Sequence, residues 1–334
     1  MIQPKKPQLY MTYVILVLCT VFLVRVIPAN AETQKKSFAQ WLKDFRIEAI
    51  AEGISPQTFD EAFEGVEPIE KVIEKDRNQP EFTMTLEDYL NRIVSKERID
   101  KGKRKFRENR QLLNEISRKY NVQPRFLVAL WGIETGFGWS YGSYPVIDSL
   151  ATLAYDPRRS SFFRKQLLHA LHILDKGYIA KEKMKGSWAG AMGGLQFMPS
   201  TFRWYAVDYN DDGRINMWQI HADLFASGAN YLSKSGWNGG QRWGREVMLT
   251  SRFDRSLGGH KIKKSVNEWQ ALGVRKLNGD DLPDSEMIAS VVIPDNSSRA
   301  FLAYHNYRVL LKWNRSDFFA IAVGLLADRI AGIR

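Results

Sequence analysis

Residues 126–138 read FLVALWGIETGFG, an apolar run followed directly by one acidic residue, Glu134. Pro124 is well placed to start a helix over this run, and three glycines end it: Gly136, Gly138 and Gly142. We therefore expect Glu134 near the carboxyl end of a buried helix, where burial and the negative helix terminus both raise a carboxyl pKa. Such a carboxyl can act as a general acid near neutral pH. The alternative is a buried glutamate neutralised by an arginine or by the start of another helix.

A second stretch, GSWAGAMGGLQFMP at 186–199, consists of small residues around one hydroxyl and one amide. Small side chains allow the backbone to approach a ligand or another helix closely. Ser187 supplies the hydroxyl, and Gln196 supplies an amide that can orient a bound amide or a water molecule. Taken alone, this composition also suits tight helix packing.

Seven motifs, in order along the chain, resemble the lytic murein transglycosylase B family. They are Glu-Thr-x-x-Gly at 134–138, Ala-Thr-Leu at 151–153, Pro-Arg-Arg at 157–159, Gly-Ser-x-Ala-Gly-Ala-Met-Gly-x-x-Gln-Phe-Met-Pro at 186–199, Ala-Asn-Tyr-Leu at 229–232, Ser-Gly-Trp at 235–237 and Trp-Asn-x-Ser at 313–316. The resemblance extends from about residue 35 to the C-terminus. It implies a mainly α fold with a lysozyme-like catalytic core. It also implies a peptidoglycan lytic transglycosylase, which cleaves the β-1,4 bond between N-acetylmuramic acid and N-acetylglucosamine and leaves a 1,6-anhydromuramoyl end.

Transferred by motif, the resemblance makes Glu134 the catalytic acid and base. It places four residues along the sugar groove: Ser187, Gln196, Tyr231 and Asn314. Two positions depart from the family pattern, since Phe162 replaces a groove tyrosine of some relatives and Trp313 stands where a tyrosine can occur. A glycosidase normally uses two carboxylates, but a transglycosylase can use the C6 hydroxyl of its own substrate as the nucleophile. One carboxylate is then sufficient, and catalysis needs no cofactor.

The loop at 208–216, DYNDDGRIN, has the spacing of a calcium-binding loop. The predicted ligands are Asp208, Asn210, Asp212, the backbone carbonyl of Arg214, and Asp223 from the next helix. Position 12 is Gln219 where a standard loop has Glu. We expect a structural calcium ion. The alternative is a cluster of Asx turns satisfied by its own backbone.

The remaining patterns divide the chain into three parts. Residues 1–31 form a predicted signal peptide, 32–120 an N-terminal helical region of the catalytic unit, and 121–334 the core. Glycine, asparagine and charged turns around a β-branched strand at 288–293 indicate a small mixed α/β insertion at about 240–298. We expect an amphipathic helix at 318–330. Asp148, a further carboxylate, is expected to N-cap the helix over 150–153.

The first 31 residues have the pattern of an export signal. Two lysines precede an apolar run at 11–24, and Ala-Asn-Ala at 29–31 offers a cleavage site. Fourteen helical residues span only about 21 Å, less than the roughly 30 Å of a bilayer core. Removal of this segment lowers the net charge from +11 to +8 and takes away Cys19, the only cysteine. We therefore expect an exported, periplasmic protein that is membrane-associated only if the segment is not cleaved.

A basic chain with 41 aromatic residues suits several polyanionic partners. The export signal argues against nucleic acid, and no nucleic-acid-binding motif is present. The expected partners are peptidoglycan glycan strands and cell-wall assembly proteins. Two alternatives remain for the function: a muramidase-type hydrolase on the same scaffold, and a non-catalytic peptidoglycan-binding scaffold.

Overall fold

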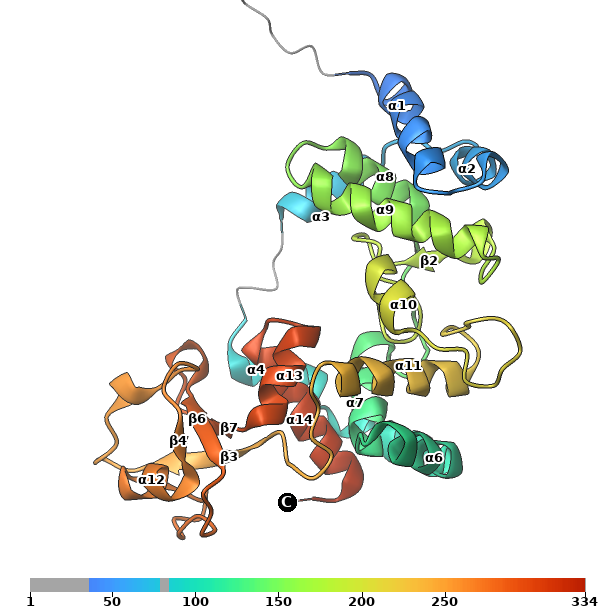
Figure 1. Cartoon of the computed structure of the whole chain (residues 1–334). Coiled ribbons are helices and arrows are strands. Elements are labelled where there is room, and N and C mark those ends of the chain that lie inside the picture. The colour runs from blue at the N-terminus through green and yellow to red at the C-terminus, as the bar shows by residue number, and fades with distance from the viewer. Residues whose placement is uncertain (1–35, 79–83, 334) are drawn as a thin grey trace, which may run out of the picture. The chain divides into compact units, whose positions relative to one another are not determined.

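Helices make up most of the structure, a computed structural model that describes residues 36–78 and 84–333 (Figure 1). The predicted signal peptide at 1–31 lies outside the described residues. The α-helices are α1 (Phe38–Ala51), α2 (Pro56–Phe63), α3 (Glu70–Arg77), α4 (Leu86–Ile93), α5 (Lys96–Glu108), α6 (Arg110–Tyr120), α7 (Pro124–Thr135), α8 (Val146–Tyr155), α9 (Ser160–Asp175), α10 (Pro199–Tyr205), α11 (His221–Lys234), α12 (Val266–Ala271), α13 (His305–Trp313) and α14 (Asp317–Ala331). The mainly α prediction is therefore confirmed.

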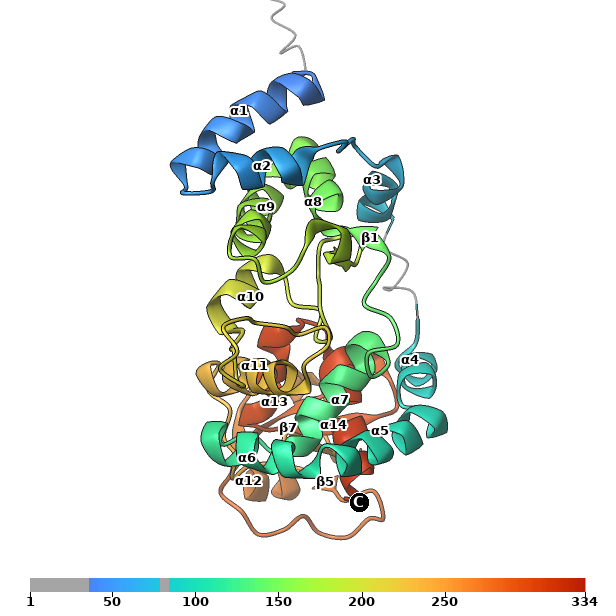
Figure 2. The ribbon, with the colours of Figure 1, turned by 90° about the vertical axis from the view of Figure 1, so that its right-hand side faces the viewer.

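The first three helices pack against α8 and α9 (Figure 2). Helix α2 begins as its sequence predicts, because the Ser55 hydroxyl accepts a hydrogen bond from the Thr58 N–H at 3.1 Å and Pro56 lies in the first turn. Aromatic rings fill the contact between α1 and α2: the Phe45 ring centroid lies 5.9 Å from that of Phe59 and 6.0 Å from that of Phe63. Helix α1 also contacts α9, since the Arg164 guanidinium lies 4.8 Å from the Phe45 ring centroid.

Helix α14 packs against α7, α5, α4 and α13. The helix predicted at 318–330 is present, but it is not amphipathic as we expected, because its neighbours bury residues on all sides of it. Gly324 lies so close to Trp243 that an added Cβ would come within 2.1 Å of the indole ring. Helix α7, whose residues from Phe126 to Gly132 are all buried, is thus fixed along its length.

Two small sheets accompany the helices. In the first, β1 (Tyr144–Pro145) pairs with β2 (Lys185–Gly186). The second has the order β4-β6-β7-β3-β5 with antiparallel neighbours, and consists of β3 (Gly244–Leu249), β4 (Lys264–Ser265), β5 (Val274–Arg275), β6 (Ile288–Val292) and β7 (Ala300–Ala303). Strand β6 lies where the β-branched run predicted a strand. The sheet covers its own core around Trp269 and extends to Ala303, beyond the predicted limit near residue 298.

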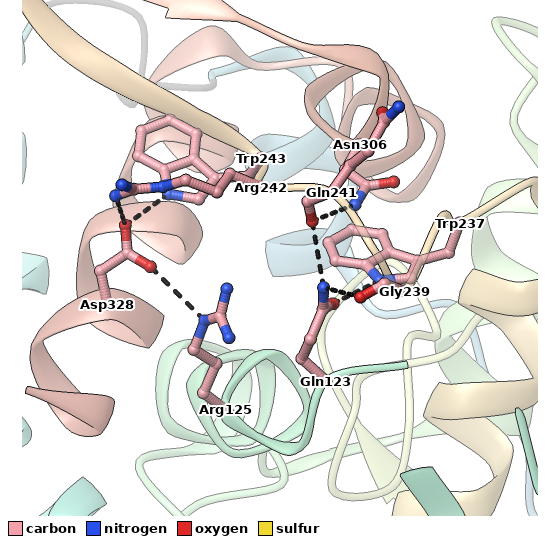
Figure 3. Close-up of polar contacts among 9 residues, drawn as sticks. All are labelled: Gln123, Arg125, Trp237, Gly239, Gln241, Arg242, Trp243, Asn306 and Asp328. Atoms are coloured by element: carbon pink, nitrogen blue, oxygen red, sulfur yellow. Dashed lines mark hydrogen bonds and ion pairs between the residues drawn. The ribbon is translucent and has the colours of Figure 1, made fainter. Parts of the chain in front are cut away.

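Side-chain hydrogen bonds connect the start of α7 to both ends of the insertion (Figure 3). Gln123 donates to the carbonyls of Gly239 and Gln241 at 2.6 and 3.0 Å and accepts from the Trp237 indole N–H at 2.7 Å. Asn306, where the chain returns to the core, donates to the Gln241 carbonyl at 3.0 Å. The insertion is therefore anchored directly to the helix that carries Glu134.

A buried ionic group lies beside this network (Figure 3). One Asp328 oxygen accepts from the Trp243 indole N–H at 2.9 Å and from Arg242 at 3.4 Å, and the other oxygen lies 3.4 Å from Arg125 Nε. Two guanidinium groups thus share one carboxylate of low exposure. Because a buried charge is costly unless it is paired, Asp328 is required to hold α7, α14 and the insertion together.

Asp148 does not cap a helix, contrary to our prediction. Helix α8 begins at Val146 with Pro145 in the N-cap position, so Asp148 lies inside the first turn. The pairing of β1 with β2 sets this start, which the local sequence did not reveal.

No helix in residues 36–78 or 84–333 is both long and apolar enough to span a membrane.

Candidate active site

Glu134 is the penultimate residue of α7, as the apolar run and the following glycines predicted. Gly136 ends the helix in the left-handed region at φ +61°. The hydroxyl of the intervening Thr135 donates to the Gly194 carbonyl at 2.9 Å. The end of α7 is thereby tied to the small-residue segment 186–199, which is far from it in sequence.

The carboxyl of Glu134 has one hydrogen-bond donor among the described residues, the indole N–H of Trp313, at 2.9 Å from Oε1. Burial raises the pKa of Glu134 to about 7, and the Trp313 hydrogen bond partly opposes this rise because it favours the charged form. The described residues provide no ion pair to Glu134, so the alternative of a glutamate neutralised by an arginine finds no partner there. The residue keeps partial solvent exposure, which leaves a route for a ligand.

Trp313 is itself held in place by aromatic neighbours. Its ring centroid lies 5.2 Å from that of Phe197 and 4.9 Å from that of Tyr231, the latter in an edge-on arrangement. The Tyr231 hydroxyl donates to the Lys312 carbonyl at 2.7 Å, one residue before Trp313. Tyr231, predicted to bind sugar, therefore also supports the residue that contacts the Glu134 carboxyl. Our sequence reasoning treated Trp313 only as a departure from the family pattern, and its place beside Asn314 was the available signal.

The segment 186–199 folds tightly on itself next to this group. The Ser187 N–H donates to the Ala191 carbonyl at 2.8 Å, and the Ser187 hydroxyl accepts from the Ala191 N–H at 3.1 Å. Gly142 packs so closely against the segment that an added Cβ would lie 2.0 Å from the Gly186 carbonyl oxygen. The small residues are therefore used for backbone-to-backbone approach.

Gln196 has a left-handed backbone conformation, with φ at +47°. Its amide nitrogen donates to the Tyr141 and Gly193 carbonyls at 3.0 and 3.1 Å. This leaves the amide oxygen without a donor among the described residues, and it can accept from a ligand. Asn314, the last predicted groove residue, is exposed, and its side-chain oxygen accepts from the Ser316 N–H at 3.0 Å.

The structure brings the predicted site residues together to different degrees. Glu134 contacts Trp313 directly. Tyr231 supports Trp313 through the Lys312 carbonyl, and Asn314 is the residue that follows Trp313 in the chain. The Thr135 bond to Gly194 connects the carboxyl to the segment that carries Gln196. Ser187 joins this arrangement through the backbone of the same segment, and within the described residues no direct hydrogen bond connects it to Glu134.

The loop at 208–216 is satisfied by hydrogen bonds of its own. Asp208 accepts from the Asp212 and Gly213 N–H groups at 3.2 and 2.8 Å. Asp223 accepts from the Tyr209 and Asn216 N–H groups, both at 2.8 Å. Such bonds are the Asx-turn arrangement that we gave as the alternative to a cation.

Three carboxylates of this loop lie close together: Asp208, Asp212 and Asp223. Burial raises the pKa of Asp223, and the neighbouring Asp208 and Asp212 carboxylates raise it further. Asn210 donates to Asp212 at 2.9 Å, and Arg214 contributes a backbone N–H to the same carboxylate. Among the described residues, however, no group of three or more His, Cys, Asp or Glu side chains is arranged to hold a metal ion.

This chain is similar to known proteins over most of its length. Residues 37–328 match the transglycosylase SLT domain family. The chain belongs to this family. It is 30% identical over 246 residues to the membrane-bound lytic murein transglycosylase B of Escherichia coli (strain K12), an alignment that covers 73% of this chain and 66% of that protein. The chain thus spans about two thirds of the length of that relative.

Solved structures of SLT-family relatives have the same fold. SltB3 from Pseudomonas aeruginosa, in complex with NAG-anhNAM-pentapeptide, is 46% identical with a TM-score of 0.86, over 89% of this chain and 80% of that one. The Escherichia coli lytic transglycosylase Slt35, in complex with calcium, is 26% identical with a TM-score of 0.75, over 87% and 92% of the two chains. These findings confirm the predicted family, its lysozyme-like fold and its enzyme class, lytic murein transglycosylase.

Proposed function

We propose that this SLT-family protein cleaves the β-1,4 bond between N-acetylmuramic acid and N-acetylglucosamine and forms 1,6-anhydromuramoyl products in cell-wall turnover. One observation carries the proposal: a single carboxyl, Glu134, has a pKa near 7 and is oriented by Trp313, with no second carboxylate contributing to its shift. A group that is half protonated at neutral pH can both give and take a proton there.

In the proposed reaction, protonated Glu134 gives its proton to the glycosidic oxygen as the bond to the muramoyl C1 breaks. The N-acetylglucosamine portion leaves with a new hydroxyl. The Glu134 carboxylate then takes the proton of the muramoyl C6 hydroxyl, whose oxygen bonds to C1 and closes the anhydro ring. Glu134 is restored to its acid form, and no water is consumed.

The groove residues have proposed roles that fit their contacts. The free amide oxygen of Gln196 accepts from a sugar N–H or hydroxyl. Asn314 or Ser187 orients the muramoyl N-acetyl group, which steadies the positive charge developing at C1. Tyr231 contributes an aromatic ring to the groove and supports Trp313 through Lys312.

Digestion of purified sacculi by the wild type and by Glu134→Gln tests the proposal. The wild type should release soluble muropeptides that end in anhydro sugars, which are lighter than hydrolysis products by one water molecule. Glu134→Gln should bind sacculi yet release almost nothing. Reducing ends in the products would indicate the muramidase-type hydrolase. Sedimentation of the wild type with sacculi, without release, would indicate a non-catalytic scaffold. Full activity of Glu134→Gln would refute the assignment.

We also propose that the protein is exported to the periplasm and that residues 1–31 act as its signal. The support is the charged and apolar pattern of those residues together with the peptidoglycan substrate. N-terminal sequencing of protein recovered from the periplasm should begin at Glu32. An intact N-terminus in a membrane fraction would instead indicate a membrane-associated form.

The loop at 208–216 is proposed to bind a structural calcium ion. Its oxygen ligands at positions 1, 3 and 5, the mutual repulsion of its carboxylates and the calcium complex of Slt35 support this. Calcium should raise the melting temperature relative to chelated protein, and Asp212→Asn should reduce that difference. An identical melting temperature with calcium and with chelator would refute the site.

A further inference from the structure

Tyr141 lies in the connection between α7 and β1, shortly after Glu134 (Figure 2). It contacts two segments that are far from it in sequence. Its backbone carbonyl accepts from the Gln196 amide nitrogen at 3.0 Å, and its side-chain hydroxyl donates to the Trp218 carbonyl at 2.6 Å. One residue therefore connects the predicted sugar-binding amide to the turn that follows the loop at 208–216.

The side chain of Gln196 makes two hydrogen bonds within the described residues, and both use the amide nitrogen. The bond to the Gly193 carbonyl closes a local turn, so it moves with Gln196 itself. The bond to the Tyr141 carbonyl fixes the amide relative to the rest of the molecule. Because the amide nitrogen has two hydrogens and both are used, the direction of the free amide oxygen depends on where the Tyr141 carbonyl lies.

The position of Tyr141 is set by its side chain. Gly138 has φ at +76°, and an added Cβ there would lie 3.0 Å from the Tyr141 hydroxyl, which therefore passes close to this glycine. Burial raises the pKa of the Tyr141 hydroxyl, so it stays protonated near neutral pH and donates. Trp218 is a fixed acceptor, because its N–H donates to the Asn216 side-chain oxygen at 3.1 Å and the Asn216 N–H donates to Asp223 at 2.8 Å.

A second hydrogen-bonded path reaches the site from the same turn, residues 216–218. The Gly194 N–H donates to the Met217 carbonyl at 2.9 Å, and the Gly194 carbonyl accepts from the Thr135 hydroxyl at 2.9 Å. The turn thus holds the end of α7 by one path and Gln196, through Tyr141, by the other. Glu134 and the Gln196 amide are thereby fixed to a common support.

We infer that Tyr141 is a positioning residue for the proposed cleavage reaction: its hydroxyl bond to Trp218 places its own carbonyl so that the Gln196 amide oxygen faces the sugar. The inference rests on the proposed function, in which that oxygen accepts from a sugar N–H or hydroxyl. Within the described residues Tyr141 forms no hydrogen bond to Glu134, whose donor is Trp313. Its effect should therefore appear in substrate binding and not in proton transfer.

Tyr141→Phe removes the hydroxyl and keeps the ring. On purified glycan strands it should raise KM about two- to tenfold, the effect of one lost neutral hydrogen bond, with kcat close to that of the wild type. The alkaline midpoint, which follows the Glu134 pKa of about 7, should not move, because the contacts of Glu134 are unchanged. Tyr307→Phe is the matched control: it removes a hydroxyl that donates to Asp317 at 2.7 Å and should leave KM unchanged.

A double-mutant cycle determines whether Tyr141 acts through Gln196. Gln196→Ala should raise KM at least as much as Tyr141→Phe, and adding Tyr141→Phe to Gln196→Ala should raise it no further. Additive effects of the two substitutions, or an unchanged KM in Tyr141→Phe, would overturn the inference. A lower kcat with an unchanged KM would overturn it as well, because that is the result of a hydroxyl that only stabilises the fold.

The same cycle, measured as binding, separates this inference from the proposed function. Each variant is combined with Glu134→Gln, and calorimetry measures the affinity for glycan strands without turnover. If the wild type cleaves no glycan, the proposed function fails, yet weaker binding caused by Tyr141→Phe that disappears in the Gln196→Ala background still supports the inference. Equal affinity with and without Tyr141→Phe, or no binding of strands at all, overturns it.

Discussion

Trp313→Phe isolates the contact that orients the carboxyl of Glu134, the proposed catalytic residue. The substitution removes the indole N–H that lies 2.9 Å from Glu134 Oε1 and keeps an aromatic ring between Phe197 and Tyr231. Because that N–H can only donate, it stabilises the charged carboxylate more strongly than the protonated acid. Its loss should therefore raise the pKa of Glu134 further.

The size of this rise follows from the energy of the bond. A hydrogen bond to a charged group contributes about 1.5–3 kcal/mol, and one pKa unit corresponds to about 1.4 kcal/mol. The pKa of Glu134 should then move from about 7 to roughly 8–9 in the variant. The acid form that starts the reaction would persist to higher pH, while the maximal rate would fall because the proton is held more tightly and the carboxyl is less well oriented.

The assay is release of soluble muropeptides from sacculi as a function of pH. The alkaline limb of kcat/KM should have its midpoint near 7 in the wild type and one to two units higher in Trp313→Phe, by the same bond energy. Tyr231→Phe is the matched control, because it removes the support at Lys312 without removing the donor to Glu134. An unchanged or lowered alkaline midpoint in Trp313→Phe would refute this account of the site.

Three further predictions concern stability. The pKa of Glu134 in the folded protein is raised from 4.5 to about 7, so the protonated carboxyl stabilises the fold below pH 4.5 and this contribution is lost as the pH rises through 7. Glu134→Gln should therefore be more stable than the wild type at pH 8, by at most about 3 kcal/mol. At pH 4 the two proteins should be equally stable in urea unfolding. Asp328→Ala leaves Arg125 and Arg242 unpaired and should cost about 3–5 kcal/mol in the same assay, whereas Asp60→Ala at the exposed Arg46 pair should cost far less. Gly324→Ala should lower stability by about 1–3 kcal/mol, since its Cβ would meet the Trp243 ring; an unchanged melting temperature would contradict that packing.

Local patterns are sufficient for helix ends where backbone chemistry is decisive. Gly136 ends α7 as predicted, and the residue types of Ser55 and Pro56 account for the start of α2, because capping and left-handed geometry depend on neighbouring residues alone. The prediction for Asp148 failed because pairing of β1 with β2 moved the start of α8. Helix α14 looked amphipathic in isolation, yet its burial depends on how many helices pack around it, which its own sequence does not record.

The same division applies to the site. The apolar run before Glu134 was enough to predict a raised pKa, because desolvation follows from a helix that is buried along its length. Trp313, 179 residues later in the chain, reaches that carboxyl only through the packing of α13 against α14 and of its ring against Phe197 and Tyr231. No local pattern connects two such positions.

The amino-acid sequence by itself determined the family, the helical architecture, the burial of Glu134 as the candidate catalytic carboxyl and the motifs around it, because these depend on residue type and on spacing along the chain. The tertiary structure alone decided which donor reaches Glu134 and that the loop at 208–216 supplies its own hydrogen bonds. It also decided that charged residues from α2, the segment after α9 and the loop before α11 line one cavity. Those features depend on distances between segments far apart in sequence, which are set only when the whole core packs.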